Sequence, residues 1–151
     1  MSWITFFIIF LDQITKLWSE KLLRYSPKNL GIFKLTYAEN TGVAFGILKN
    51  YSFVHGIISF IIITIILFVY RVFLSKHRNI LNDIAVSFIC GGAAGNMIDR
   101  IRFGYVVDMI YVPYFSVFNI ADSFVTIGGL LLVISILKGS TKSETKYYGK
   151  F

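Results

Sequence analysis

The chain has 151 residues, of which 56% are hydrophobic and only 15% are charged. Soluble domains are about 45–50% apolar and about 25% charged, so this composition excludes an ordinary soluble protein and indicates a single multi-pass membrane domain, residues 1–151. The formal net charge is +7, but the basic residues lie between apolar runs, which argues against nucleic acid as a partner and favours membrane topology signals.

Residues 2–19 are predicted to form a first, retained transmembrane helix, although a span usually needs about 20 mostly apolar residues. Asp12, Gln13 and Lys16 follow its apolar part, where a cleavable signal would carry small residues. Asp12 and Lys16 are four positions apart and therefore share one helix face. We expect this face to point into the protein.

Residues 31–48 are predicted to form a small sheet at the membrane surface. Apolar and polar side chains alternate over residues 33–38, as in a half-exposed strand. Residues 40–42, Asn-Thr-Gly, indicate a turn. The apolar stretch 43–48 is predicted to be a second strand.

The rest of the chain predicts three more spans, at residues 53–72, 81–98 and 117–137. Residues 99–116 are interpreted as a second surface loop. The lysine-rich residues 139–151 are interpreted as a disordered tail. Four spans place both termini on one side, and the positive-inside rule favours the cytoplasm for that side.

Gly91 and Gly95 lie four residues apart in the third predicted span. Such a small-xxx-small pattern allows the backbone of another helix to approach closely. We therefore interpret the glycines as helix-packing positions.

Two aspartates lie at the edges of apolar runs, Asp108 and Asp122. Ionisable groups at membrane depth are costly and mark a functional site by default. On one straight helix the two would be roughly 21 Å apart, but a loop containing Pro113 separates them and lets the chain reverse. We expect the two carboxyl groups to meet.

A pair of adjacent carboxyl groups shares one proton and titrates as a unit. Such a pair can take a proton from water and donate one to a carbonyl oxygen, which hydrolyses a peptide bond without a covalent intermediate. Asn119 lies three residues before Asp122 and is expected to orient a carboxylate or the substrate, while Arg100 balances negative charge. For Asp99 we favour a structural ion pair.

Other chemistries have weaker support in the sequence. A metal site needs clustered ligands, and His55, His77 and Cys90 lie far apart, so neither a metal nor another cofactor is predicted. A serine–lysine pair formed by Ser123 and Lys16 stays open as an alternative.

Two rivals come from other functional classes. A transporter or channel subunit would use Asp12, Lys16, Asp108 and Asp122 as an ion path. The second predicted span carries no charge before Arg71 at its end, however, and the acids gather on one side. A membrane scaffold packed through its glycines leaves the two aspartates unexplained.

Five stretches, in this order, resemble motifs of the bacterial lipoprotein signal peptidase family, signal peptidase II. They are Asp12-Gln13 with Lys16; Asn40 with Gly42, Ala44 and Phe45; Gly95-Asn96 with Asp99-Arg100; Val107-Asp108; and Phe118-Asn119-Ile120-Ala121-Asp122. The resemblance implies an all-α membrane protein with four transmembrane helices and a small extracytoplasmic β-sheet. It also implies a membrane aspartic endopeptidase that cleaves lipid-modified prolipoproteins before the diacylglyceryl cysteine.

The matching positions imply the roles of individual residues. Asp108 and Asp122 take the catalytic positions. The substrate-binding or supporting positions are taken by Asp12, Lys16, Asn40, Gly42, Asn96, Asp99, Arg100 and Asn119. Met109 stands where phenylalanine is common in the family, and this exchange keeps an apolar side chain.

The resemblance further implies partners and location. The expected partners are diacylglyceryl-modified prolipoproteins, membrane lipid and inhibitory cyclic peptide antibiotics such as globomycin, and the chain is expected to act as a monomer. We expect it in the bacterial cytoplasmic membrane, with both termini cytoplasmic and the site near the outer leaflet. The sheet, with Tyr37 and Phe45, is expected to clamp the extended signal segment.

Overall fold

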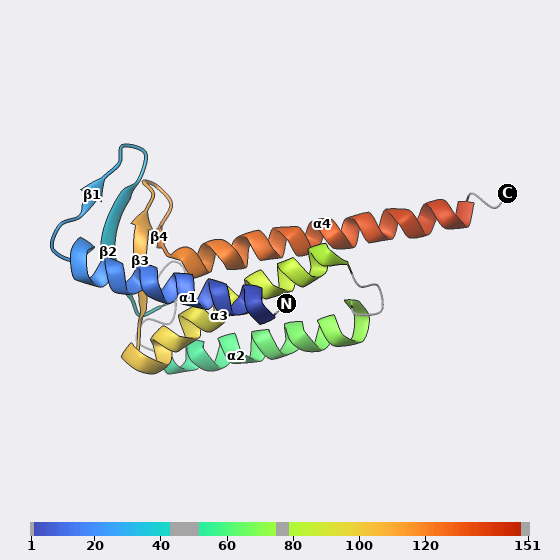
Figure 1. Cartoon of the computed structure of the whole chain (residues 1–151), viewed down its shortest axis with the longest axis horizontal. Coiled ribbons are helices and arrows are strands. Elements are labelled where there is room, and N and C mark those ends of the chain that lie inside the picture. Colours follow the sequence, from blue (N-terminus) through green and yellow to red (C-terminus); the bar gives the residue numbers. More distant parts are fainter. Residues whose placement is uncertain (1, 43–51, 75–78, 149–151) are drawn as a thin grey trace.

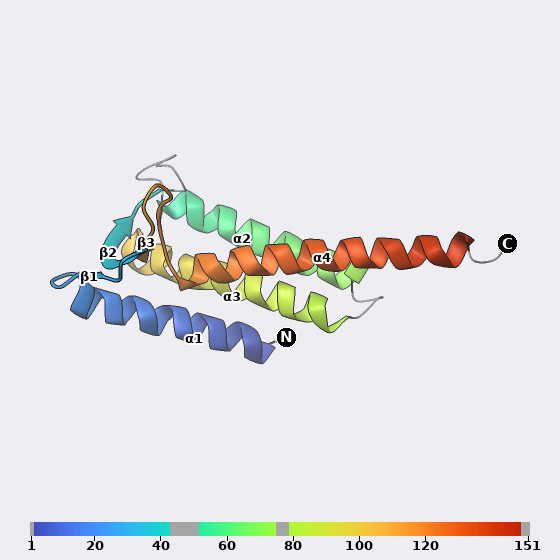
Figure 2. The ribbon, with the colours of Figure 1, turned by 90° about the horizontal axis from the view of Figure 1, so that it is seen from above.

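The computed structural model of the chain describes residues 2–42, 52–74 and 79–148. These residues form the helices α1 (Ser2–Trp18), α2 (Ser52–Val69), α3 (Ile80–Phe103) and α4 (Ile120–Tyr148), with π-helical turns at η1 (Ser19–Leu23) and η3 (Tyr70–Leu74). The long helices run side by side, and a small sheet lies at one end of the bundle (Figures 1 and 2). The predicted helical architecture with a small sheet is confirmed, and the sheet is antiparallel.

Membrane-spanning capacity is clearest for the later helices. In the described part of the chain, α3 and the Ile120–Lys138 portion of α4 are long and apolar enough to cross a membrane, and Gly56–Val72 is a shorter apolar helix. The 17-residue α1 carries the buried Asp12 and Lys16 in its second half. The expectation of four spans therefore stays a prediction.

The sheet has four antiparallel strands in the order β1 (Lys28–Asn29), β2 (Lys34–Asn40), β3 (Val106–Tyr111) and β4 (Val117–Phe118). The strand predicted from the alternation over 33–38 corresponds to β2, whereas the strand predicted at 43–48 lies outside the described residues.

The prediction of a loop over 99–116 was wrong, because this segment completes α3 and then supplies β3. Val106, Val107 and Met109 are all buried. A strand buried on both faces lacks the polar–apolar alternation that reveals a half-exposed strand.

The boundaries of α3 have local causes. The Asn79 side chain accepts a hydrogen bond from the Leu81 N–H and caps the start of the helix. Gly104 ends the helix in the left-handed conformation, with φ 77°, and its N–H bonds back to the Arg100 carbonyl. The helix therefore extends beyond the predicted span 81–98 and includes Asp99 and Arg100.

Helix α4 also differs from its predicted limits. Residues 117 and 118 form β4, and the helix starts at Ile120 and continues to Tyr148. The expected disorder over 139–151 was therefore wrong as far as residue 148. No proline interrupts this stretch, and each added residue contributes one more helical hydrogen bond once the helix has started.

The glycines of α3 permit close helix packing. Helix α3 contacts α1, α2 and α4. A Cβ at Gly92 would collide with the Ala121 carbonyl oxygen of α4, and a Cβ at Gly91 would lie 2.9 Å from the Ile8 Cβ of α1. At Gly128 of α4, a Cβ would lie 2.8 Å from the Ala85 carbonyl oxygen of α3. Small residues thus set how closely α3 meets its neighbours.

We expect Gly92→Ala to destabilise the protein by about 1–3 kcal/mol, because the new methyl group must push α4 away from α3. Thermal unfolding in detergent measures the effect. Gly129→Ala is the matched control, since a Cβ there meets nothing within 4 Å. Equal unfolding temperatures for the two variants would contradict this account of the α3–α4 contact.

Candidate active site

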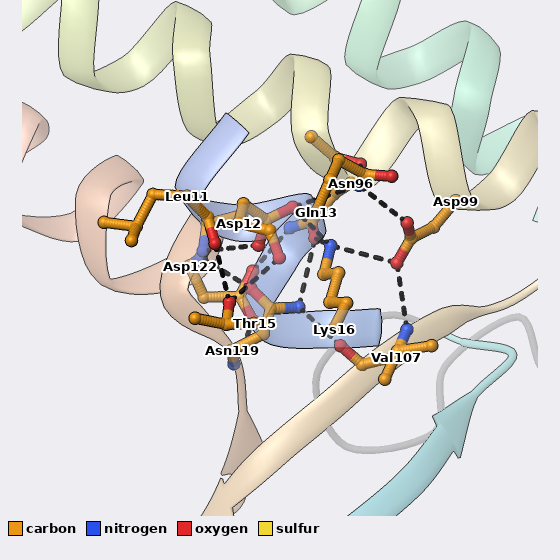
Figure 3. A network of polar contacts seen from close by, with 12 residues as sticks. Leu11, Asp12, Gln13, Thr15, Lys16, Asn96, Asp99, Val107, Asn119 and Asp122 are labelled. Atoms are coloured by element: carbon orange, nitrogen blue, oxygen red, sulfur yellow. Dashed lines mark hydrogen bonds and ion pairs between the residues drawn. The ribbon is translucent and has the colours of Figure 1, made fainter. Parts of the chain in front are cut away.

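The predicted polar residues gather where α1, α3 and the start of α4 meet β3, at the sheet end of the bundle (Figure 3). Six of them are buried, with at most 8% of their surface exposed: Asp12, Lys16, Asn96, Asp99, Asp108 and Asn119. Burying a polar side chain costs free energy unless the side chain is hydrogen-bonded, and each of these six side chains has hydrogen-bond or ion-pair partners.

Asp108 projects from β3 and accepts two amide hydrogen bonds. Asn40 donates to its Oδ2 at 2.9 Å, and Asn119 donates to its Oδ1 at 2.7 Å. The register of the sheet, which pairs Ala38 with Asp108, brings Asn40 into reach. The Asn40 Oδ1 accepts a bond from the Gly42 N–H at 3.0 Å, which leaves its amide nitrogen directed at Asp108.

Asp122 lies in the first turn of α4, and its carboxylate is held by reciprocal capping. The Asp122 N–H donates to the Asn119 Oδ1 at 2.9 Å, and the Asn119 N–H donates to the Asp122 Oδ2 at 3.3 Å. On the other carboxylate oxygen, Oδ1, Asp122 accepts a bond from the Asn96 Nδ2 at 2.7 Å. The first turn of α4 thereby fixes the orientation of this acid.

Two asparagines connect the two acids. The Asn119 Nδ2 donates to the Asn96 Oδ1 at 3.0 Å as well as to Asp108. The Asn96 amide in turn bonds Asp122. Asp108 and Asp122 therefore belong to one continuous amide network, although β3 and α4 supply them separately.

Behind this network lies a buried ion cluster. The Lys16 Nζ is 2.8 Å from Asp12, 2.9 Å from Asp99 and 2.9 Å from the Asn96 Oδ1. Asp12 accepts a bond from the Ala121 N–H at 3.0 Å, and Asp99 accepts one from the Val107 N–H at 3.1 Å. The cluster thus joins α1, α3, β3 and α4, which are the elements that carry the amide network.

Gln13 belongs to the same cluster, although the sequence did not single it out as a site residue. Its Nε2 donates to the Asp99 Oδ1 at 2.9 Å and to the Gly95 carbonyl at 3.2 Å. Gln13 lies three residues before Lys16 on α1, so helical spacing could have identified it.

The electrostatic setting favours a proton on Asp108. Burial raises the pKa of Asp108 to about 7, and the Asp122 charge adds to the rise, while the hydrogen bonds from Asn40 and Asn119 and the Lys16 charge oppose it. Arg100 interacts electrostatically with both Asp108 and Asp122. One acid of the pair can thus hold a proton near neutral pH.

A cavity of about 710 Å³ opens beside Asp122. Its lining residues are Asn40, Gly42, Arg100, Phe115, Ser116, Val117, Phe118, Asp122, Ser123, Thr126 and Ile127. The sequence did not predict Thr126 and Ile127 as lining residues, but Thr126 is one helical turn beyond Asp122, so helical spacing could have found this wall. For Phe115 and Ser116, in the turn between β3 and β4, no comparable signal exists.

The serine–lysine alternative gains no support from the contacts. The Ser123 Oγ donates to the Asn119 carbonyl at 3.1 Å. Lys16 is bound to Asp12, Asp99 and Asn96. Among the contacts of the described residues, none joins Ser123 to Lys16.

Tyr37, which was expected to line the substrate clamp, is not among the residues that line the cavity. Its hydroxyl donates to Glu39 at 2.9 Å and lies 3.4 Å from the Tyr105 hydroxyl. Phe45, the other expected clamp residue, lies outside the described residues.

Comparison with known proteins identifies relatives of one kind. Residues 4–138 match the family described as Signal peptidase (SPase) II. The chain is 38% identical over 148 residues to a lipoprotein signal peptidase of Clostridium tetani, covering 93% of this chain and 94% of the relative. It is 40% identical over 143 residues to a lipoprotein signal peptidase of Caldanaerobacter subterraneus, covering 90% and 95% of the two chains.

Solved structures agree with these sequence relatives. A bacterial membrane enzyme determined by the in meso method at 2.3 Å resolution is similar with a TM-score of 0.81 and 32% identity, covering 92% of this chain and 88% of that one. A second bacterial membrane enzyme, at 1.9 Å resolution, is similar with a TM-score of 0.77 and 32% identity, covering 89% and 90%.

Proposed function

The chain belongs to the signal peptidase II family of bacterial membrane peptidases that process lipoproteins, and on that premise we propose that it is an aspartic endopeptidase with Asp108 and Asp122 as its dyad. Its proposed substrates are prolipoproteins already modified with diacylglycerol, cut before the lipid-bearing cysteine. The observation that carries the proposal is the single amide network that connects Asp108 to Asp122, the acid that lines the cavity.

The network supports a division of roles. Asp122, which lines the cavity, takes a proton from the attacking water. Asp108, whose pKa is raised to about 7, donates a proton to the carbonyl oxygen of the scissile bond. Asn40, Asn96 and Asn119 hold the carboxyl groups in place, and Arg100 offsets their negative charge.

The cavity supports binding of a lipid-modified peptide. Phe115, Phe118 and Ile127 provide an apolar wall, while Asn40 and Arg100 provide polar groups near the proposed dyad. An apolar pocket with a few directed polar groups is the usual form of a ligand site. The same cavity is the proposed binding site of cyclic peptide antibiotics such as globomycin.

We extend the proposal to topology. Four helices span the membrane, both termini face the cytoplasm, and the sheet with the dyad lies at the outer leaflet. The proposal also takes the protein to act as a monomer.

Cleavage of purified prolipoprotein tests the proposed substrate. We expect the protein in lipid vesicles to cut a diacylglyceryl-modified prolipoprotein and to leave the same precursor without its lipid intact. Mass spectrometry of the product should show the lipid-modified cysteine as the new N-terminal residue. Equal cleavage of both precursors, or a cut elsewhere, would overturn the proposed specificity.

The activity should also depend on pH through Asp108. This acid must be protonated to donate, and its pKa of about 7 means that it loses its proton as the pH rises through neutrality. We therefore expect kcat/KM to fall about tenfold per pH unit at alkaline pH, because the protonated fraction falls by that factor. A rate that keeps rising between pH 7 and pH 9 would contradict the assignment of Asp108 as the proton donor.

A further inference from the structure

Two hairpin tips form an exposed apolar edge of the sheet. Strands β1 and β2 are joined through residues 30–33, and β3 and β4 through residues 112–116. Lys34 pairs with Tyr111 across β2 and β3, so the two tips are neighbours. We call this edge the apolar rim, and its exposed side chains are Leu30, Ile32, Phe33, Tyr111, Tyr114 and Phe115.

Backbone hydrogen bonds hold the rim in a defined conformation. The Leu30 N–H bonds the Phe33 carbonyl at 3.0 Å, and the Phe115 N–H bonds the Val112 carbonyl at 3.2 Å, so each tip is held by its own backbone. Ile32 is 85% exposed and Tyr114 is fully exposed. Tyr114 also has a φ of 64°, a conformation that is unfavourable for a bulky residue and is usually kept for a function.

The position of the rim relative to the helices indicates what covers it. In Figure 1 the hairpins project across the direction of the helices and reach sideways past α4. If the helices cross a membrane, a segment that projects at right angles to them runs parallel to the bilayer plane. The rim therefore overhangs the lipid next to the bundle instead of pointing into water above it.

The charges at the rim fit the same partner. Lys28 and Lys34 flank the tip of the first hairpin, and both are exposed. In the part of the chain that the structure describes, neither lysine forms an ion pair with an acid. Lysines beside exposed tyrosine and phenylalanine are the composition of a segment that lies in the headgroup region of anionic lipid.

We propose that the apolar rim inserts into the headgroup region of the outer leaflet, where Lys28 and Lys34 contact anionic phospholipid. Insertion hides apolar surface that is otherwise exposed to water. Because β3 belongs to the same sheet, the inserted rim also fixes the depth of the strand that carries Asp108. The proposal rests on the proposed membrane topology, and it holds whether or not the chain cleaves prolipoproteins.

Depth-dependent fluorescence quenching tests the insertion. Ile32→Cys and Tyr114→Cys would each be labelled with an environment-sensitive fluorophore, with Glu39→Cys, near the opposite end of β2, as the matched control. The unmodified chain reports background labelling at the buried Cys90, and circular dichroism checks the fold. In vesicles containing phosphatidylglycerol, we expect headgroup-level spin-labelled lipid to quench residues 32 and 114 more strongly than residue 39. If aqueous iodide quenched residues 32 and 114 more strongly than the spin-labelled lipid does, the rim would lie in water and the proposal would be overturned. Stronger quenching by a second labelled copy of the chain than by the lipid would also overturn it, because the rim would then contact another protein molecule.

The charge contribution has its own test. Lys28→Gln with Lys34→Gln, placed in the labelled Ile32→Cys chain, should reduce lipid quenching in phosphatidylglycerol vesicles. The reduction should vanish in vesicles of zwitterionic lipid alone, where the lysines have no anionic headgroup to contact. An equal effect of the two substitutions in both kinds of vesicle would rule out recognition of anionic lipid.

Discussion

Replacing Asp108 with asparagine is expected to lower the single-turnover cleavage rate by about 10³-fold or more, which is within the range for the loss of a positioned acid. Asparagine has nearly the same shape but cannot supply the proton that we assign to Asp108. In the parent protein, the amide nitrogens of Asn40 and Asn119 lie 2.9 and 2.7 Å from the Asp108 carboxylate oxygens, and both residues are unchanged in the variant. Substrate binding should change much less than the rate of the chemical step, so the loss should appear in kcat.

The matched control for Asp108→Asn is Glu39→Gln. Glu39 lies on the neighbouring strand β2, and its exposed carboxylate pairs with Arg24 at 2.7 Å. Glu39 does not line the cavity. We expect near-parental cleavage from this variant. A folded Asp108→Asn protein that retained parental kcat would remove Asp108 from the chemistry.

Replacing Lys16 with methionine is expected to destabilise the protein by about 3–5 kcal/mol, which is the usual cost of breaking a buried ion pair. The change leaves Asp12 and Asp99 buried without the cation that they share at 2.8 and 2.9 Å. It also removes one hydrogen bond from Asn96, which bonds Asp122. Cleavage should therefore fall together with the unfolding temperature.

Two comparisons separate charge from packing. Lys28→Met at an exposed position should leave the unfolding temperature nearly unchanged. The triple variant Lys16→Met, Asp12→Asn, Asp99→Asn has no net charge in the cluster, and it should recover much of the lost stability. If the triple variant were less stable than Lys16→Met, uncompensated charge would not be the cause.

Periodicity predicted the parts of the fold that have a strong local signal. The helical spacing of Asp12 and Lys16 predicted a face turned into the protein, and both side chains are buried. The alternation over residues 33–38 predicted β2. In both segments one face is apolar and the other is polar, and this contrast is visible in the sequence.

The sequence signal was weaker where burial covers every side of an element. Strand β3 is buried on both faces over Val106, Val107 and Met109. Its sequence therefore shows no alternation of polar and apolar residues, and this segment was interpreted as part of a loop. Strand β4 has two residues, which is too short for any period. Strand β1 also has two residues and was not predicted either. The sheet therefore contains three strands that local patterning did not predict.

The candidate site divides in a similar way. The acids could be identified because charges are rare in apolar runs. The bonds that connect them could not, since Asn40, Asn96 and Asn119 come from three separate elements and meet only after β2 and β3 have paired. Their long-range geometry depends on the register of the sheet, which no single segment specifies.

The most direct test of the dyad is single-turnover cleavage of diacylglyceryl-modified prolipoprotein by the parent protein, Asp122→Asn and Ser123→Ala side by side. The two substituted residues are adjacent on α4 and both line the cavity. The proposed mechanism predicts that Asp122→Asn loses cleavage, whereas Ser123→Ala retains it. Loss of cleavage in Ser123→Ala with activity retained in Asp122→Asn would contradict the aspartic dyad and assign the chemistry to a serine nucleophile.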